Sequence, residues 1–140
     1  NIAAIMKHYF SEFEINDLLE LDEVSQRERF FDLWALKESY IKATGKGLAT
    51  SLKSFSFDFS NLTQQTLPLH SSGLQPELHG EIIVNYGVGL DVTEQGDAST
   101  DWQCSLGRLD NQFRFAVTLG GATLPMQLEM KCFPKSKLLG

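Results

Sequence analysis

The stretch of sequence that decides the fold is FDLWALKESYIKATGKGL, residues 31–48. Its apolar residues recur every three or four positions, which predicts an α-helix at 3.6 residues per turn. Lys37 falls inside the apolar arc of this helix, whereas Glu38 and Lys42, four residues apart, share one face. A buried charge is costly unless a partner of opposite sign lies near it. A bound anion, with a metal on the carboxylate, would supply that partner.

Spacing alone leaves two interpretations of these charges open. Glu38 and Lys42 match a common surface ion pair, which contributes about 0.5 kcal/mol or less. Lys37 matches a side chain at the edge of the core whose ammonium reaches water. Gly45 after the helix is a usual C-terminal stop. Lys46, which follows it, reads either as a solvated loop residue or as a contact to phosphate.

The first third of the chain, residues 1–47, reads as helical. Ser11 with Glu14 and Ser25 with Glu28 have the S-x-x-E spacing of a capping box, in which each side chain bonds the backbone of the other residue. Each box predicts the start of a helix. A short apolar stretch over residues 2–9 predicts one further helix before them. Three helices are expected in all, over residues 2–9, 12–19 and 26–44.

The remainder, residues 48–140, is rich in strands. Alternating apolar residues predict strands at 54–59, 81–86, 102–109, 112–119 and 126–133. Asp110–Asn111 is a two-residue hairpin signal. Residues 60–79 read as a long loop, and residues 87–100 as a second loop or a weak, irregular strand. Helices followed by an antiparallel meander predict an α+β fold, with the helices packed on one face of the sheet.

The composition is that of one compact domain. The chain has 140 residues, 42% of them hydrophobic, with ten Phe to fill a core. Its net charge of −6 argues against nucleic acid and against an anionic membrane surface. No apolar run is long enough to cross a bilayer and no signal peptide is visible, so a cytoplasmic protein is expected. Cys104 and Cys132 are expected to be reduced core residues, and the three His make no zinc spacing.

The identity of the residues in the opening stretch adds more than their spacing. The run from Trp34 to Leu48 resembles W-x-x-K-E-[SA]-x-x-K-x-x-G-x-G-L, the signature of the 4′-phosphopantetheinyl transferases. It is most similar to the two-lobed, surfactin-synthetase-activating type. The likeness extends to residues 9–14 and 52–57, and beyond about residue 60 it is one of pattern only.

The resemblance implies a Mg²⁺-dependent enzyme. It would transfer the 4′-phosphopantetheine arm of coenzyme A to a serine of an acyl or peptidyl carrier protein and release 3′,5′-ADP. By the same resemblance Glu38 is a Mg²⁺ ligand and helps to deprotonate the serine, directly or through a bound water. Lys42 would face the pyrophosphate, with Lys37 and Lys46 as further candidates for coenzyme A. Trp34 is expected to pack the helix against the sheet.

One departure from the family concerns the metal. The second family motif, G-x-D-x-E, supplies two more acidic ligands, and this sequence lacks it. The chain therefore resembles the C-terminal lobe of a larger enzyme, with an incomplete active site that a missing N-terminal lobe or a second copy would complete. Two other functions stay open. One is a carrier-protein-binding or scaffold lobe without catalysis, and the other is a coenzyme A-binding module independent of Mg²⁺.

Overall fold

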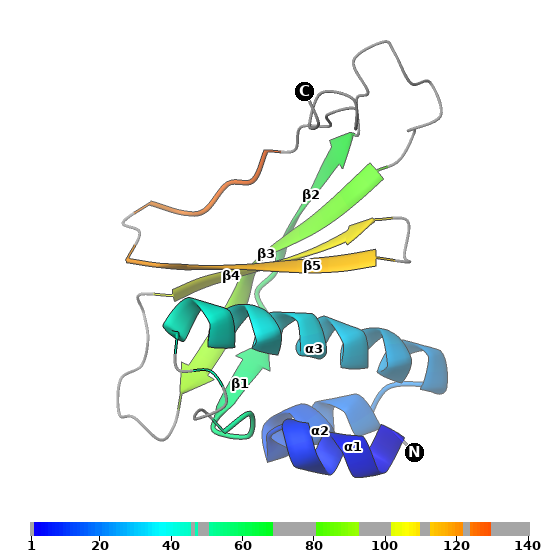
Figure 1. Ribbon diagram of the computed structural model, residues 1–140. Helices are drawn as coiled ribbons and strands as arrows, with labels where there is room; N and C mark the ends of the chain where they lie inside the picture. The colour runs from blue at the N-terminus through cyan, green and yellow to red at the C-terminus, as the bar shows by residue number, and fades with distance from the viewer. Residues whose placement is uncertain are drawn as a thin grey trace, which may run out of the picture.

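The computed structural model describes residues 2–45, 47, 51–68, 81–92, 102–109, 113–121 and 124–129. Three helices come first in the chain: α1 (Ile2–Tyr9), α2 (Glu12–Leu19) and α3 (Glu23–Thr44). Five strands follow: β1 (Phe55–Asp58), β2 (Thr63–Pro68), β3 (Glu81–Val92), β4 (Trp102–Leu109) and β5 (Phe113–Gly120). The predicted α+β fold is confirmed, with the helices gathered on one face of an antiparallel sheet (Figure 1).

The strands lie in the order β1-β3-β4-β5, and β2 also pairs with β3. β3 is long enough to pair with two strands along one edge, β2 at residues 81–86 and β1 at residues 89–92. Gly87 stands at the join, where the pairing of β3 with β4 shifts register. Its φ of 78° is a conformation that suits glycine, and an added Cβ would lie 2.9 Å from the backbone oxygen of Asn61.

Two stretches of the strand-rich part that were expected to be a loop or irregular contain strand residues in the structure. Residues 63–68 form β2 within the expected long loop, and β3 runs through to Val92 where a second loop or irregular strand was expected. β2 was missed because the Gln and Thr residues that suggested a loop are held by ladder hydrogen bonds to β3. The irregular-strand alternative for residues 87–100 is confirmed as far as Val92, since the pairing of β3 with β4 shifts register beside Gly87. The antiparallel pairing of β4 and β5 is confirmed, but Leu109 pairs with Phe113, so three residues separate the strands where two, Asp110–Asn111, were expected. Asp110–Asn111 itself lies outside the described residues.

The expected last strand, residues 126–133, is wrong over the part that the structure describes. Residues 124–129 are not a strand but cross the face of the sheet opposite α3 (Figure 1). Side chains of the sheet hold this segment: Met126 N donates to Gln103 at 2.5 Å, and Leu128 N donates to the Tyr86 hydroxyl at 3.0 Å. Side chains of the sheet, and not the backbone of a neighbouring strand, bind the backbone N–H groups of this segment. The alternation of apolar residues therefore did not indicate a strand here.

The helix starts follow their caps. The box at Ser11 and Glu14 is confirmed, since each side chain bonds the backbone N–H of the other residue. The box expected at Ser25 and Glu28 is wrong: α3 begins at Glu23, and Asp22 caps it by accepting from Ser25 N at 2.7 Å. An Asp at the N-cap satisfies an otherwise unpaired N–H, so the helix starts three residues earlier than expected.

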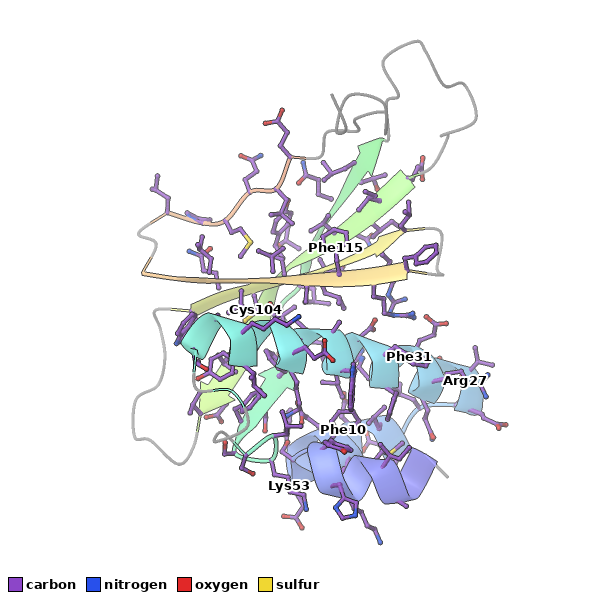
Figure 2. The ribbon with its side chains drawn as sticks, viewed as in Figure 1. Phe10, Arg27, Phe31, Lys53, Cys104 and Phe115 are labelled. Carbon is purple, nitrogen blue, oxygen red and sulfur yellow. The ribbon has the colours of Figure 1, made fainter. Side chains whose placement is uncertain are left out.

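The core lies between α3, the α1–α2 pair and the inner face of the sheet. Figure 2 shows Cys104 on the side of β4 that faces α3, and Phe115 on the opposite side of the sheet. Leu33 and Leu36 of α3 meet Phe55 and Phe57 of β1, and each of the four is 1% exposed or less. Burying four such side chains contributes about 1.5–3 kcal/mol each. α3 is therefore fixed against the rest of the fold, and the side chains on its outer face are presented from a rigid element.

Candidate active site

The outer, solvent-exposed face of α3 carries two of the charged residues that the sequence singled out, Glu38 and Lys42. Glu38 and Lys42 are both exposed, one turn apart on this helix. No ion pair within 4.0 Å joins them in the part of the chain that the structure describes. A carboxylate and an ammonium thus face solvent on the same side of the helix, and they do not form an ion pair with each other.

A hollow opens beside Glu38. It has a volume of about 350 Å³ and is lined by residues of α3 and one residue of β5, namely Phe31, Trp34, Ala35, Glu38 and Arg114. Figure 2 shows Phe31 on α3, on the side that the α1–α2 pair leaves open. Phe31 is 48% exposed and Trp34 37% exposed. The site is therefore an aromatic surface with a carboxylate at one end and a guanidinium at its side.

Trp34 does not have the expected role of packing α3 against the sheet. Its ring meets Tyr9 of α1 edge-on, with the centroids 5.2 Å apart, and stacks with Phe30 at 6.3 Å. At 3.6 residues per turn, Trp34 and Glu38 are one turn apart on the same side of the helix. The indole therefore shares the outer face with Glu38, and burial against the sheet falls to Leu33 and Leu36.

Lys37 is separated from Glu38 and Lys42. Its side chain is buried, and its ammonium contacts three groups: Glu14 at 2.8 Å, the carbonyl of Leu52 at 2.5 Å and the carbonyl of Phe55 at 2.8 Å. The expected partner of opposite sign exists, but it is an internal carboxylate from α2. Burial lowers the pKa of Lys37, and the nearby Glu14 carboxylate opposes that effect.

A second charged cluster joins α3 to the sheet, and the sequence did not point to it. Asp32, 2% exposed, accepts from Arg108 of β4 and from Nε of Arg114 of β5, the latter at 2.7 Å. Arg114 also donates to Glu28, which lies one turn before Asp32. The available signal was the pair of arginines on either side of the predicted hairpin, facing acidic residues at i and i+4 of a helix. Because Arg114 also lines the hollow, this cluster fixes the edge of the site.

The metal ligand set within this chain is small. In the described ranges no three His, Cys, Asp or Glu side chains lie close enough together to hold a metal ion. Glu28 and Asp32 are taken up by arginines, which leaves Glu38 as the acidic side chain of the hollow. One carboxylate fits Mg²⁺ as a partial site, because Mg²⁺ commonly takes one or two carboxylates together with waters and substrate phosphates.

The remaining expectations concern Lys46, membrane-spanning helices and the two cysteines. Lys46 lies outside the described residues, so the structure does not locate this candidate for coenzyme A contact. Among the described helices, none is long and apolar enough to cross a membrane. Cys104 is a free, buried thiol as expected, and Cys132 lies outside the described residues.

The comparison with known families agrees with the signature on α3. The sequence profile of the 4′-phosphopantetheinyl transferase superfamily matches residues 1–106. This stretch includes all three helices, the α3 residues that line the hollow, strands β1 to β3 and the first part of β4, whereas Arg114 and β5 lie beyond it. The chain belongs to the 4′-phosphopantetheinyl transferase superfamily.

Individual relatives cover part of the chain. It is 43% identical over 68 residues to the 4′-phosphopantetheinyl transferase Sfp of Bacillus subtilis (strain 168), which is 49% of this chain and 30% of the relative. It is 43% identical over 63 residues to the transferase gsp of Aneurinibacillus migulanus, 45% of this chain and 26% of the relative. A longer match, 30% identical over 117 residues, is to the L-aminoadipate-semialdehyde dehydrogenase-phosphopantetheinyl transferase of Xenopus laevis, 83% of this chain and 33% of the relative. The chain spans about a third of the length of these curated relatives.

Proposed function

We propose that the protein transfers the 4′-phosphopantetheine arm of coenzyme A to a serine of an acyl or peptidyl carrier protein, with release of 3′,5′-ADP. The observation that carries the proposal is the placement of Glu38 and Lys42 together, exposed on one face of a rigid helix, within a stretch that matches the superfamily. Since coenzyme A is the donor, we also propose a cytoplasmic location.

The chemistry asks for charge and positioning. Transfer of a substituted phosphoryl group proceeds mostly by holding donor and acceptor in line and by offsetting negative charge on the phosphate oxygens. Lys42 offers an ammonium, which binds phosphate as a point charge. Glu38, one turn away, is within the same face and can accept the proton of the attacking serine hydroxyl, directly or through a water.

Glu38 is also the residue of this chain that would hold Mg²⁺. When bound, the ion would polarise phosphate oxygens and orient them. A carboxylate free of internal ion pairs suits that role, whereas Asp32 and Glu28 do not because arginines already neutralise them. With one carboxylate in the described hollow, the remaining ligands would come from substrate, from water or from residues outside the described site.

The hollow suggests how the carrier protein is received. Phe31 and Trp34 form an apolar surface next to Glu38, and exposed aromatic residues of this kind are frequent anchors in protein interfaces. We propose that the carrier protein packs on this surface so that its serine reaches Glu38.

The test is a modification assay. The protein is mixed with coenzyme A, Mg²⁺ and an apo carrier protein, and the carrier is followed by mass spectrometry for the gain of the phosphopantetheine arm. Modification that needs both coenzyme A and Mg²⁺ supports the proposal. Binding of the carrier without any mass gain would favour a scaffold, and coenzyme A binding that is indifferent to Mg²⁺ would favour a simple binding module.

A further inference from the structure

The Lys37 ammonium has no donor left for a substrate. A protonated lysine has three N–H donors, and the three contacts to Glu14, Leu52 and Phe55 account for all of them. The ammonium also lies 4.3 Å from the ring centroid of Phe55 and 5.9 Å from those of Phe10 and Phe57. It is therefore enclosed by carbonyls, one carboxylate and aromatic faces that each favour a cation.

The Glu14 carboxylate is equally occupied. Oε1 accepts from Ser11 N at 3.0 Å and from the Lys37 ammonium, while Oε2 accepts from Phe57 N at 3.0 Å. Glu14 is 2% exposed. The carboxylate thus ties the first turn of α2 to strand β1, and through Lys37 it ties both to the middle of α3.

The pair also holds the chain where it returns from α3. The helix ends at Gly45, whose N–H donates to Ile41 O at 3.2 Å, and the chain comes back beside the helix at Leu52. Leu52 O, within the Ser51–Ser54 turn, and Phe55 O, just after that turn, both accept from Lys37. The adjoining segment is consequently anchored to the residue that immediately precedes Glu38.

We propose that Lys37 is a positioning residue and not a phosphate ligand: with Glu14 it clamps residues 52–55 against α2 and α3, and so fixes the rotation of α3 that presents Glu38 and Lys42. The inference rests on the proposed function for its effect on turnover. Its structural half, the clamp on residues 52–55, stands independently of that function.

The decisive variant is Glu14→Gln. Gln keeps the size of the side chain but replaces one accepting oxygen with an NH2 donor, which cannot accept from a backbone N–H, and Glu14 is remote from the outer face of α3. Glu14→Gln leaves the Lys37 cation in place, so a direct phosphate contact by Lys37 would be kept or strengthened. If Lys37 and Glu14 instead clamp residues 52–55, the substitution weakens that clamp. The matched control is Asp17→Asn, which removes the carboxylate of the exposed ion pair between Asp17 and Arg29.

The expected results separate binding from turnover. In Glu14→Gln, kcat should fall about tenfold while the dissociation constant for coenzyme A, measured by calorimetry, changes less than threefold; Asp17→Asn should change neither. The kcat of the double variant Glu14→Gln with Lys37→Met should be no lower than that of the poorer single variant, because the effects of two residues that act as one unit are not additive. Replacing a buried ion pair as a whole is commonly tolerated, so this variant also guards against misfolding of Lys37→Met alone.

Hydrogen exchange gives a readout that needs no activity. Peptides covering residues 51–57 should exchange at least tenfold faster in Glu14→Gln than in the parent, and at the parent rate in Asp17→Asn. Unchanged exchange there would overturn the clamp even if the parent proves to have no transferase activity. A loss of coenzyme A affinity above tenfold in the folded double variant, with parental affinity in Glu14→Gln, would make Lys37 a phosphate ligand and overturn the proposal.

Discussion

Lys37 and Glu38 are neighbours in the chain, and α3 turns them to opposite environments. Lys37 is 2% exposed and bound to Glu14, whereas Glu38 is exposed at the rim of the hollow. Successive residues on an α-helix point about 100° apart, which is enough to place one inside the core and the next outside it. These two adjacent charged residues of the signature therefore differ in environment, Lys37 inside the fold and Glu38 beside the hollow.

Replacing Glu38 with Gln should abolish most of the transfer activity. The change keeps the size of the side chain but removes the charge that would hold Mg²⁺ and accept a proton. The rate of carrier modification should fall by about 10²–10⁴, the range of a general-base or metal-charge contribution. Glu20→Gln, at the exposed C-cap of α2, is the matched control and should retain the parental rate. Near-parental turnover in Glu38→Gln would end the assignment of this residue.

Replacing Lys42 with Ala should weaken coenzyme A binding much more than it weakens folding. Loss of one charged contact to phosphate should cost about 1.5–3 kcal/mol of binding free energy. The free energy of unfolding should change by under about 0.5 kcal/mol, since Ala is the best helix former and Lys42 is exposed. Calorimetry with coenzyme A and a thermal melt measure the two effects. Lys7→Ala on α1 is the matched control, and equal affinity in both variants would contradict the role of Lys42.

Replacing Asp32 with Asn should destabilise the fold strongly. Asp32 is buried and accepts from two arginines, so removing its charge leaves Arg108 and Arg114 with the single carboxylate of Glu28 between them. Breaking a buried pair in this way should cost about 3 kcal/mol of unfolding free energy. Asp17→Asn removes an exposed pair and should cost under about 1 kcal/mol. Urea denaturation of both variants decides the matter, and similar losses in the two would show that the Asp32 cluster is not a structural anchor.

The Cys104 thiol should make the fold weaker in alkaline solution. Burial raises its pKa from 9.0 to about 11, and a hydrogen bond with Thr118 opposes this in part. The folded state thus disfavours the thiolate, so the contribution to stability is complete below pH 9 and is lost as the pH rises from 9 to about 11.

The measurement is urea denaturation at pH 8 and pH 10.5 in the parent and in Cys104→Ala. The unfolding free energy of the parent should fall with pH by up to about 2 kcal/mol more than that of the variant. Identical pH dependence in the two proteins would contradict the raised pKa. As a second readout, the folded Cys132→Ser variant, in which Cys104 is the one remaining thiol, should resist alkylation at pH 8.5 until urea unfolds it.

Local patterns predicted the helical third well. The bounds of α1 and α2 agree with the prediction, and the Ser11–Glu14 box is a contact between residues three apart that sequence spacing can reveal. Strand positions were predicted where alternation was regular, as in β4 and β5. β2 was missed because its Gln and Thr residues form a strand only when paired with β3, and such pairing depends on residues 13 to 23 positions away.

The features of the site likewise fall into those that the sequence determined and those that the tertiary structure decided. The sequence by itself determined the family and the outward placement of Glu38 and Lys42, because helical periodicity and a contiguous motif are local properties. Only the tertiary structure decided that Lys37 pairs with Glu14, that Trp34 lies on the outer face, and that Arg114 borders the hollow. Lys37 and Glu14 lie 23 positions apart along the chain, and Arg114 lies 83 positions from Phe31 of the hollow. The packing of helices and strands determines which partner a buried charge meets, because it brings together residues that are distant in the chain. The spacing of residues along the sequence does not predict that packing.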